Sequence, residues 1–170
     1  TIPADAYWGV HTERAVENFP ISGTTVAAMP DLIRALGFVK KAAARANAEF
    51  GVLDGPRARA VMLACDDLID GHLHEQFVVD VIQGGAGTST NMNANEVIAN
   101  RALELMGRQR GDYAACHPND HVNLGQSTND VYPTAVRIAT IFMLRSLLSA
   151  MEKLKAALHA KGQEFKDIIK

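Results

Sequence analysis

Residues 141–170 read IFMLRSLLSAMEKLKAALHAKGQEFKDIIK, and this stretch decides the fold. Its large apolar residues follow a seven-residue repeat that is broken only at Lys161. The repeat comprises Leu144, Leu147, Met151, Leu154, Leu158, Phe165 and Ile168. Spacings of three and four place these side chains on one face of a helix. With Pro133 in its first turn, this helix is predicted to run to the end of the chain over about 50 Å.

A compact domain of 170 residues cannot bury so long a rod, and its apolar stripe requires partner helices. The repeat continues to Lys170 without a C-cap signal, so we expect the sequence to be part of a longer chain. The fold class we predict is mostly α. A small, irregular helical N-terminal domain at residues 1–130 is followed, at residues 131–170, by the first long helix of a helical bundle.

Upstream of the repeat, the pattern predicts shorter helices. Residues 1–30 are punctuated by proline and glycine, which favours irregular structure with at most one helical turn. Apolar spacings of three and four then predict helices over 31–51, with Asp31 as N-cap, over 56–71 and over 90–106.

Composition excludes several classes of protein. Hydrophobic residues make up 48% of the chain, so it is not a disordered chain, and the net charge of -2 without a basic cluster argues against nucleic-acid binding. No apolar run approaches the ~20 residues of a membrane span. Cys65 and Cys116 form no C-x-x-C pair, which favours a reducing, cytoplasmic location. The histidines form no convincing metal-binding set.

A first polar loop, residues 83–93, reads QGGAGTSTNMN. Its glycines allow the backbone to approach a ligand, while Thr88 and Ser89 supply hydroxyl groups. The loop leads into a predicted helix, whose free N–H groups and dipole favour an anion. The alternative interpretation is an ordinary glycine turn with serine or threonine caps.

A second polar loop, residues 126–130, reads QSTND and also precedes a helix. Ser127 and Asp130 have the spacing of a capping box, which is the structural interpretation. The functional interpretation is a second cluster of hydrogen-bond donors. Two such clusters could hold a small molecule with two carboxylates, although neither loop contains an obvious general base.

Three ordered motifs resemble the aspartase/fumarase superfamily, and the resemblance extends over the whole chain. They are GVHTERAVENF at residues 9–19, the glycine loop continuing into NEVIAN at residues 95–100, and HPNDHVNLGQSTND at residues 117–130. Ala86, Thr128 and the pair Val10–His11 resemble the aspartase branch, where class II fumarases usually have serine, serine and Ala-Gln. His117 is the exception, because a histidine there is frequent in fumarases.

The resemblance implies a homotetramer in which each active site takes residues from three subunits. It implies reversible anti elimination of ammonia from L-aspartate to give fumarate, with a serine on a mobile loop as the base. That serine lies downstream of Lys170 in the family, so no catalytic residue is expected within this chain. No organic cofactor is implied, and no metal ligands can be assigned.

Carried over residue by residue, the resemblance implies four substrate contacts. Thr88 and Asn129 would face the amino group, and Ser127 and Thr128 would hold carboxylate oxygens. A secondary anion site would comprise His117, Asn119 and Asp120.

Two other functions stay open at this point. A class II fumarate hydratase has the same fold, with water in place of ammonia. A non-catalytic helical assembly domain would use the long helix as the seam of an oligomer.

Overall fold

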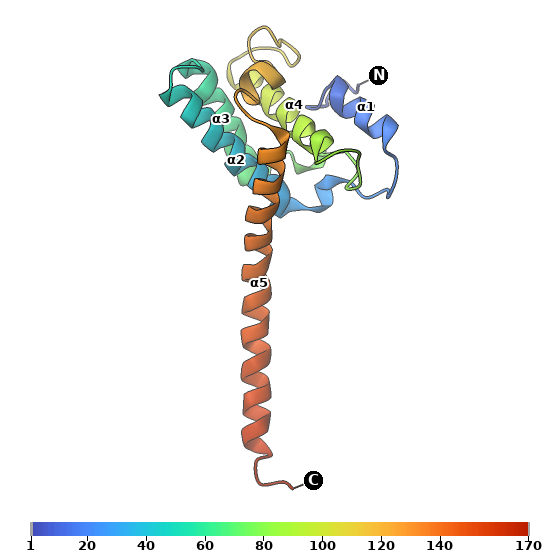
Figure 1. The fold of residues 1–170 in the computed structure, drawn as a ribbon, viewed down its shortest axis with the longest axis vertical. Helices are drawn as coiled ribbons and strands as arrows, with labels where there is room; N and C mark the ends of the chain where they lie inside the picture. Colours follow the sequence, from blue (N-terminus) through green and yellow to red (C-terminus); the bar gives the residue numbers. More distant parts are fainter. Residues whose placement is uncertain (1, 170) are drawn as a thin grey trace.

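The computed structural model describes residues 2–169 as a helical head from which one long helix projects (Figure 1). The elements in chain order are α1 (Val10–Asn18), η1 (Val26–Ala28), α2 (Pro30–Glu49), α3 (Gly55–Ile69), η2 (His74–Gln76), α4 (Thr88–Leu105), η3 (Pro118–Val122) and α5 (Thr128–Glu164). In the described residues the extended pairing is limited to one isolated antiparallel bridge between Thr25 and Asp80. The predicted mostly helical fold is confirmed.

Helices α2 and α3 are consecutive and pack against each other, and α4 packs on α3 (Figure 1). The Asp54 side chain caps α3 by accepting a hydrogen bond from the Arg57 N–H. Ile33, Leu36, Val61 and Leu68 are fully buried between these helices and form part of the head's core. Burying a side chain of this size contributes about 1.5–3 kcal/mol.

Helix α4 is the centre of the head, because α1, α3, η3 and α5 all contact it. Unusually for so buried a helix, many of its hidden side chains are polar. The buried polar residues are Ser89, Thr90, Asn91, Asn93, Asn95, Glu96 and Asn100. Buried polar groups must be hydrogen-bonded to be tolerated, so each of these positions is a potential attachment point for another segment.

The Glu96 carboxylate attaches the start of α1 to α4. It accepts hydrogen bonds from the backbone N–H groups of Gly9, His11 and Thr12 at 2.8, 3.0 and 3.1 Å. It also accepts one from the Thr12 hydroxyl at 2.6 Å. A carboxylate at a helix N-terminus satisfies N–H groups that have no partner within the helix and lies favourably in its dipole.

Asn93 and Asn100 attach two further segments to α4. Asn93 donates to the carbonyl of Gln76 at 3.0 Å. Asn100 donates to the carbonyl of Tyr7 at 2.6 Å and accepts from the N–H of Gly111 at 2.8 Å. Loops far apart in sequence are therefore fixed on one helix by its side-chain amides.

Helix α5 runs from Thr128 to Glu164 without a break, as the seven-residue repeat predicts. Only Val131, Ala135 and Ala139 are buried among its residues. The Phe142 ring still packs against Phe38 of α2, and the C-terminal part of the helix then leaves the head (Figure 1). Its exposed large apolar side chains include Ile141, Met143, Leu144, Leu147, Leu148, Met151, Leu154 and Leu158. The stripe therefore lies open along most of its length.

By length and composition alone α5 also meets the description of a membrane span, with a mean hydropathy of 1.4 in its most apolar window. Its polar residues argue for a bundle instead. Arg137 and Arg145 interrupt the apolar half, and Lys153, Lys155 and Lys161 lie among the heptad residues of the other half. One apolar stripe with charges elsewhere is typical of a helix that packs against other helices in water.

The structure corrects several boundaries. Helix α5 begins at Thr128 rather than near Pro133 and ends at Glu164 rather than at the chain end. Helix α2 begins at Pro30, so Met29 and not Asp31 is its N-cap, because proline suits the first helical position. Helix α1 has nine residues rather than one turn, since Glu96 stabilises its start. The domain boundary between residues 130 and 131 stays a prediction.

We predict that the 170-residue chain in isolation self-associates. Each large apolar side chain of the stripe gains about 1.5–3 kcal/mol on burial, and so large an open patch is uncommon in soluble monomers. Light scattering should give a mass above that of one chain. Replacing Leu147 and Leu154 with glutamate should reduce this mass, and a monomeric wild-type chain with a rigid α5 would contradict the prediction.

Candidate functional site

The two polar loops of the sequence meet where α4 and α5 begin. A cavity of about 590 Å³ lies between them. Its walls are formed by Val81, Ile82, Gln83, Gly85, Ala86, Gly87, Asn129, Tyr132 and Pro133. The structure thus brings Asn129 together with the glycine loop, although the two are more than forty residues apart in sequence.

The glycine loop can pass between two aromatic rings only because it lacks side chains. A Cβ atom at Gly87 would lie 2.2 Å from the Tyr132 ring, and one at Gly84 would lie 2.9 Å from the Phe19 ring. Gly85 and Gly87 also adopt the left-handed conformation, with φ of +80° and +87°. Tyr132 belongs to α5, so its contact with Gly87 sets how closely the two loops approach.

Gln83 closes the base of the glycine loop. Its amide nitrogen donates to the Thr90 hydroxyl at 2.7 Å, and its amide oxygen accepts from the Thr90 N–H at 2.9 Å. The N-cap of α4 is Gly87, which has no side chain to cap the helix. The interpretation of this loop as a turn with serine or threonine caps is therefore wrong.

Asp80 fixes the chain just before this loop. Its carboxylate accepts hydrogen bonds from the Ser22 N–H, the Ser22 hydroxyl, the Gly23 N–H and the Ile82 N–H. These donors, the Ile82 N–H foremost, lower the pKa of Asp80 to about 2. The carboxylate is therefore ionised at neutral pH. Its hydrogen bonds join the segment that precedes the glycine loop to Ser22 and Gly23.

The predicted substrate contacts occupy different places around the cavity. Asn129 lines it, whereas Thr88, Ser127 and Thr128 are not among its lining residues and stand at the starts of the two helices. The Thr88 hydroxyl faces Gly85, since a Cβ there would lie 3.5 Å from its oxygen. Ser127 is the N-cap of α5, and its oxygen accepts from the Asn129 N–H at 3.2 Å. The cap at Ser127 is confirmed, whereas the part of Asp130 in a capping box and the four substrate contacts stay predictions.

Thr128 is connected to α4 and to a buried lysine. The side-chain nitrogen of Asn91 donates to the Thr128 hydroxyl oxygen at 3.0 Å and to Oδ1 of Asn123 at 3.2 Å. The same Asn123 oxygen accepts from Nζ of Lys40 at 2.8 Å. Burial lowers the pKa of Lys40 to about 7. The spacing of apolar residues did not identify Lys40, Asn91 or Asn123, since a polar residue on a helix is ordinarily assigned to its wet face.

Pro133 removes a hydrogen-bond donor beside the cavity. Having no N–H, it cannot donate to the carbonyl of Asn129, four residues earlier in α5. The carbonyl of Asn129 therefore lacks its usual helical partner.

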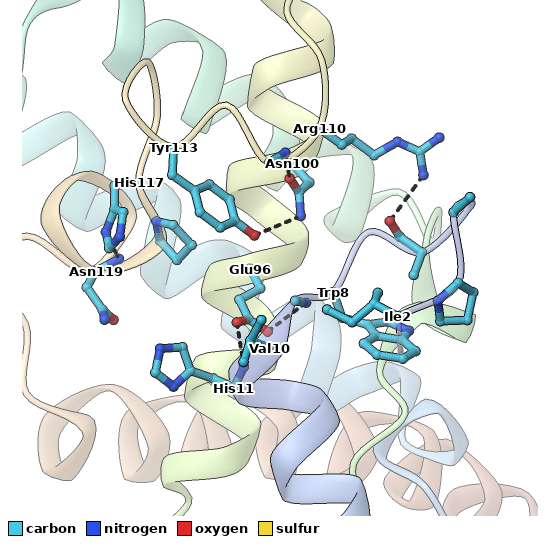
Figure 2. Close-up of a pocket in the computed structure, with 16 residues that line it drawn as sticks. Ile2, Trp8, Val10, His11, Glu96, Asn100, Arg110, Tyr113, His117 and Asn119 are labelled. Atoms are coloured by element: carbon cyan, nitrogen blue, oxygen red, sulfur yellow. Dashed lines mark hydrogen bonds between the residues drawn. The ribbon is translucent and has the colours of Figure 1, made fainter.

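The predicted secondary anion site borders a different cavity, of about 460 Å³ (Figure 2). His117 and Asn119 line it together with Trp8, His11 and Tyr113, but the exposed Asp120 is not among the lining residues. Nδ1 of His117 accepts from the N–H groups of Asn119 and Asp120 at 3.1 and 3.2 Å. This arrangement leaves Nε2 as the donor of a neutral ring. The anion site itself stays a prediction.

Within residues 2–169, no group of three or more histidine, cysteine or carboxylate side chains is arranged to hold a metal ion. Both cysteines, Cys65 and Cys116, are buried, and burial raises the pKa of each thiol. A protonated, inaccessible thiol is a poor nucleophile, which excludes them as reactive groups at the cavity.

Comparison with known proteins places this geometry in a family of lyases. The family model described as "Lyase" matches residues 1–170. The chain is 54% identical over 169 residues to an aspartate ammonia-lyase of Pseudomonas aeruginosa and 52% identical over 170 residues to one of Escherichia coli. Each alignment covers 99% of this chain and 36% of the relative. The chain therefore spans about a third of the length of these relatives.

Solved structures show the same likeness. A "fumarate lyase:delta crystallin" from Brucella melitensis superposes with a TM-score of 0.95 at 60% identity, covering 96% of this chain and 37% of that one. A class II fumarase from Schistosoma mansoni gives a TM-score of 0.75 at 37% identity, over 81% and 29% of the two chains. The chain belongs to the lyase family, within the aspartase/fumarase superfamily, and is similar over nearly its whole length to aspartate ammonia-lyases.

We predict that Gly87→Ala destabilises the protein by more than Gly51→Ala. Both glycines have φ near +80°, so the backbone cost of the substitution is matched, but the space at Gly51 is open whereas Tyr132 blocks Gly87. Overpacking of this kind costs about 1–3 kcal/mol. Thermal unfolding of the two variants should show the difference, and equal midpoints would contradict the close contact with Tyr132.

Proposed function

We propose that this chain is part of an ammonia-lyase that reversibly eliminates ammonia from L-aspartate to give fumarate. The observation that carries the proposal is the meeting of the two donor loops at one cavity, in a chain about 53% identical to aspartate ammonia-lyases over 99% of its length. Membership of the lyase family supports a small-molecule substrate. The hydroxyl and amide donors of the two loops suit a substrate with two carboxylates.

The proposed reaction explains why hydroxyl and amide donors, more than charged side chains, are expected at this cavity. Removal of a proton from C3 of aspartate turns the neighbouring carboxylate into an aci-carboxylate dianion. Hydroxyl and amide donors that are already positioned stabilise such developing charge without reorganising. We assign this role to Ser127 and Thr128, with Thr88 and Asn129 toward the departing amino group.

The surroundings of these residues agree with the assignment. Ser127 and Thr128 both accept a hydrogen bond through oxygen, from the Asn129 N–H and from Asn91 respectively, so each retains its O–H to donate. Asn129 lines the cavity, and the hydroxyl donors of Ser127 and Thr128 stand at the start of the same helix.

The base that removes the proton is expected outside this chain. Neither polar loop contains a side chain with an evident activating partner, and elimination requires a base at C3. We therefore propose that a serine removes the proton, and that this serine lies in the part of the full-length enzyme that the 170-residue chain does not include.

The exposed stripe of α5 supports an assembled enzyme. We propose a homotetramer whose long helices pack together, in the cytoplasm, with residues of several subunits completing each active site. A seam with a seven-residue apolar repeat is suited to this role. Because the chain matches enzymes over almost its whole length, we favour this over an assembly domain without catalysis.

Fumarate hydratase is the second candidate, and His117 favours it together with the likeness to the Schistosoma mansoni fumarase. The lower identity to that fumarase, 37% against 52–54% to the ammonia-lyases, favours aspartate. Ultraviolet absorbance of fumarate, measured with the full-length enzyme and either L-aspartate or L-malate, separates the two. We expect fumarate from aspartate, and fumarate from malate alone would overturn the proposal.

In the full-length enzyme, we predict that Thr88→Ala lowers kcat/KM for aspartate roughly ten- to a hundredfold. A lost hydrogen bond to a charged group costs about 1.5–3 kcal/mol, which corresponds to this range. Thr24→Ala, at an exposed threonine that does not line the cavity, is the matched control and should leave kcat/KM unchanged. Wild-type kinetics in the Thr88 variant would remove Thr88 from the site.

We also predict that the 170-residue chain alone produces no fumarate from aspartate, because it lacks the base. The same absorbance assay tests this, with the full-length enzyme as the positive control. Turnover by the isolated chain would mean that a base lies among its own residues.

A further inference from the structure

Lys40 is an anomaly in the core of the head. It lies on α2 with 0% of its surface exposed, although lysine is almost never fully buried unless it is paired. Within residues 2–169, no carboxylate forms an ion pair with it; its hydrogen-bond partner is the neutral amide of Asn123, at 2.8 Å. Burying an ammonium against an amide alone is costly, so a function for Lys40 is worth seeking.

The lysine determines which way the Asn123 amide points. In its ammonium form Lys40 can only donate, which directs the oxygen of Asn123 toward Nζ at 2.8 Å. The Asn123 nitrogen is then directed to the carbonyl of Gln126, to which it donates at 3.0 Å. Reversing this amide would place an NH₂ group against the ammonium and lose both hydrogen bonds.

The orientation of Asn123 in turn determines that of Asn91. The Asn123 oxygen also accepts from the side-chain nitrogen of Asn91 at 3.2 Å, so Asn91 must present its NH₂ group on this side. The same NH₂ group donates to the hydroxyl oxygen of Thr128 at 3.0 Å. Only 1% of Asn91 is exposed, so bulk water cannot readily replace these contacts.

Thr128 is the last residue in the series of hydrogen bonds that begins at Lys40. A hydroxyl has one hydrogen, and because the Thr128 oxygen accepts from Asn91, that hydrogen is directed away from α4. We infer that Lys40 is a positioning residue that acts through Asn123 and Asn91 to hold the Thr128 hydroxyl as a donor for the anionic substrate. The inference rests on the proposed function, since it takes Thr128 as a substrate contact.

A double-mutant cycle in the full-length enzyme tests this role. Lys40→Met keeps an unbranched side chain one atom shorter and loses the donor, and Thr128→Val removes the hydroxyl. We expect each single variant to lower kcat/KM for aspartate roughly tenfold or more. If Lys40 acts through Thr128, the double variant should be no worse than Thr128→Val alone. Effects that multiply in the double variant would overturn the inference and make Lys40 merely structural.

If Lys40→Met does not fold, a second variant, Asn91→Asp, tests the same series of hydrogen bonds. Asn91→Asp is nearly isosteric but replaces the donor by an acceptor, so the Thr128 hydrogen turns toward the new carboxylate and away from the substrate. We expect a similar loss of kcat/KM, again without further loss when it is combined with Thr128→Val. Wild-type kinetics for Asn91→Asp would overturn the inference.

Lys41→Met is the matched control. This neighbouring lysine is partly exposed and forms an ion pair with Asp66 at 2.5 Å, away from Asn123. Its loss should leave kcat/KM unchanged, whereas a loss equal to that of Lys40→Met would contradict a specific role for Lys40. A wild-type enzyme that makes no fumarate from aspartate would instead refute the proposed function, and the inference with it.

Discussion

Helix α4 is buried along its length and yet carries seven buried polar side chains, and this constraint organises the head. A hidden amide or carboxylate is costly without a partner, and Asn93, Glu96 and Asn100 of α4 find theirs in segments from distant parts of the sequence. Glu96 fixes the start of α1, and Asn100 fixes the segments at Tyr7 and Gly111. Replacing these side chains by apolar ones would leave the head's core filled but its loops without fixed positions.

The candidate site is a consequence of the same constraint. Asn91 joins α4 to the first residue of α5, and Gly87 at the start of α4 lies against the Tyr132 ring of α5. Two loops that are far apart in the sequence, residues 83–93 and 126–130, therefore face one cavity. Lys40 adds a buried amino group to this junction, a cost in stability that the proposed binding role of Thr128 would explain.

Much of the fold could be predicted from the sequence, because helices and their apolar faces follow from periodicity. The repeat around Leu147 predicted the long α5, and the polar loops drew attention to Thr88 and Asn129. The start of α1 could not be predicted, since it depends on Glu96, more than eighty residues away. Lys40 could not be identified either, because periodicity cannot show which polar residues on a helix are buried.

The central claim is that α4 brings two loops together around one dicarboxylate. A crystal structure of the full-length enzyme with fumarate bound tests it most directly. The account predicts that the ligand lies between the glycine loop and the start of α5, with a carboxylate oxygen within hydrogen-bonding distance of the Thr128 hydroxyl and the other end near Thr88. Fumarate bound away from both loops, or touching only one of them, would contradict the account.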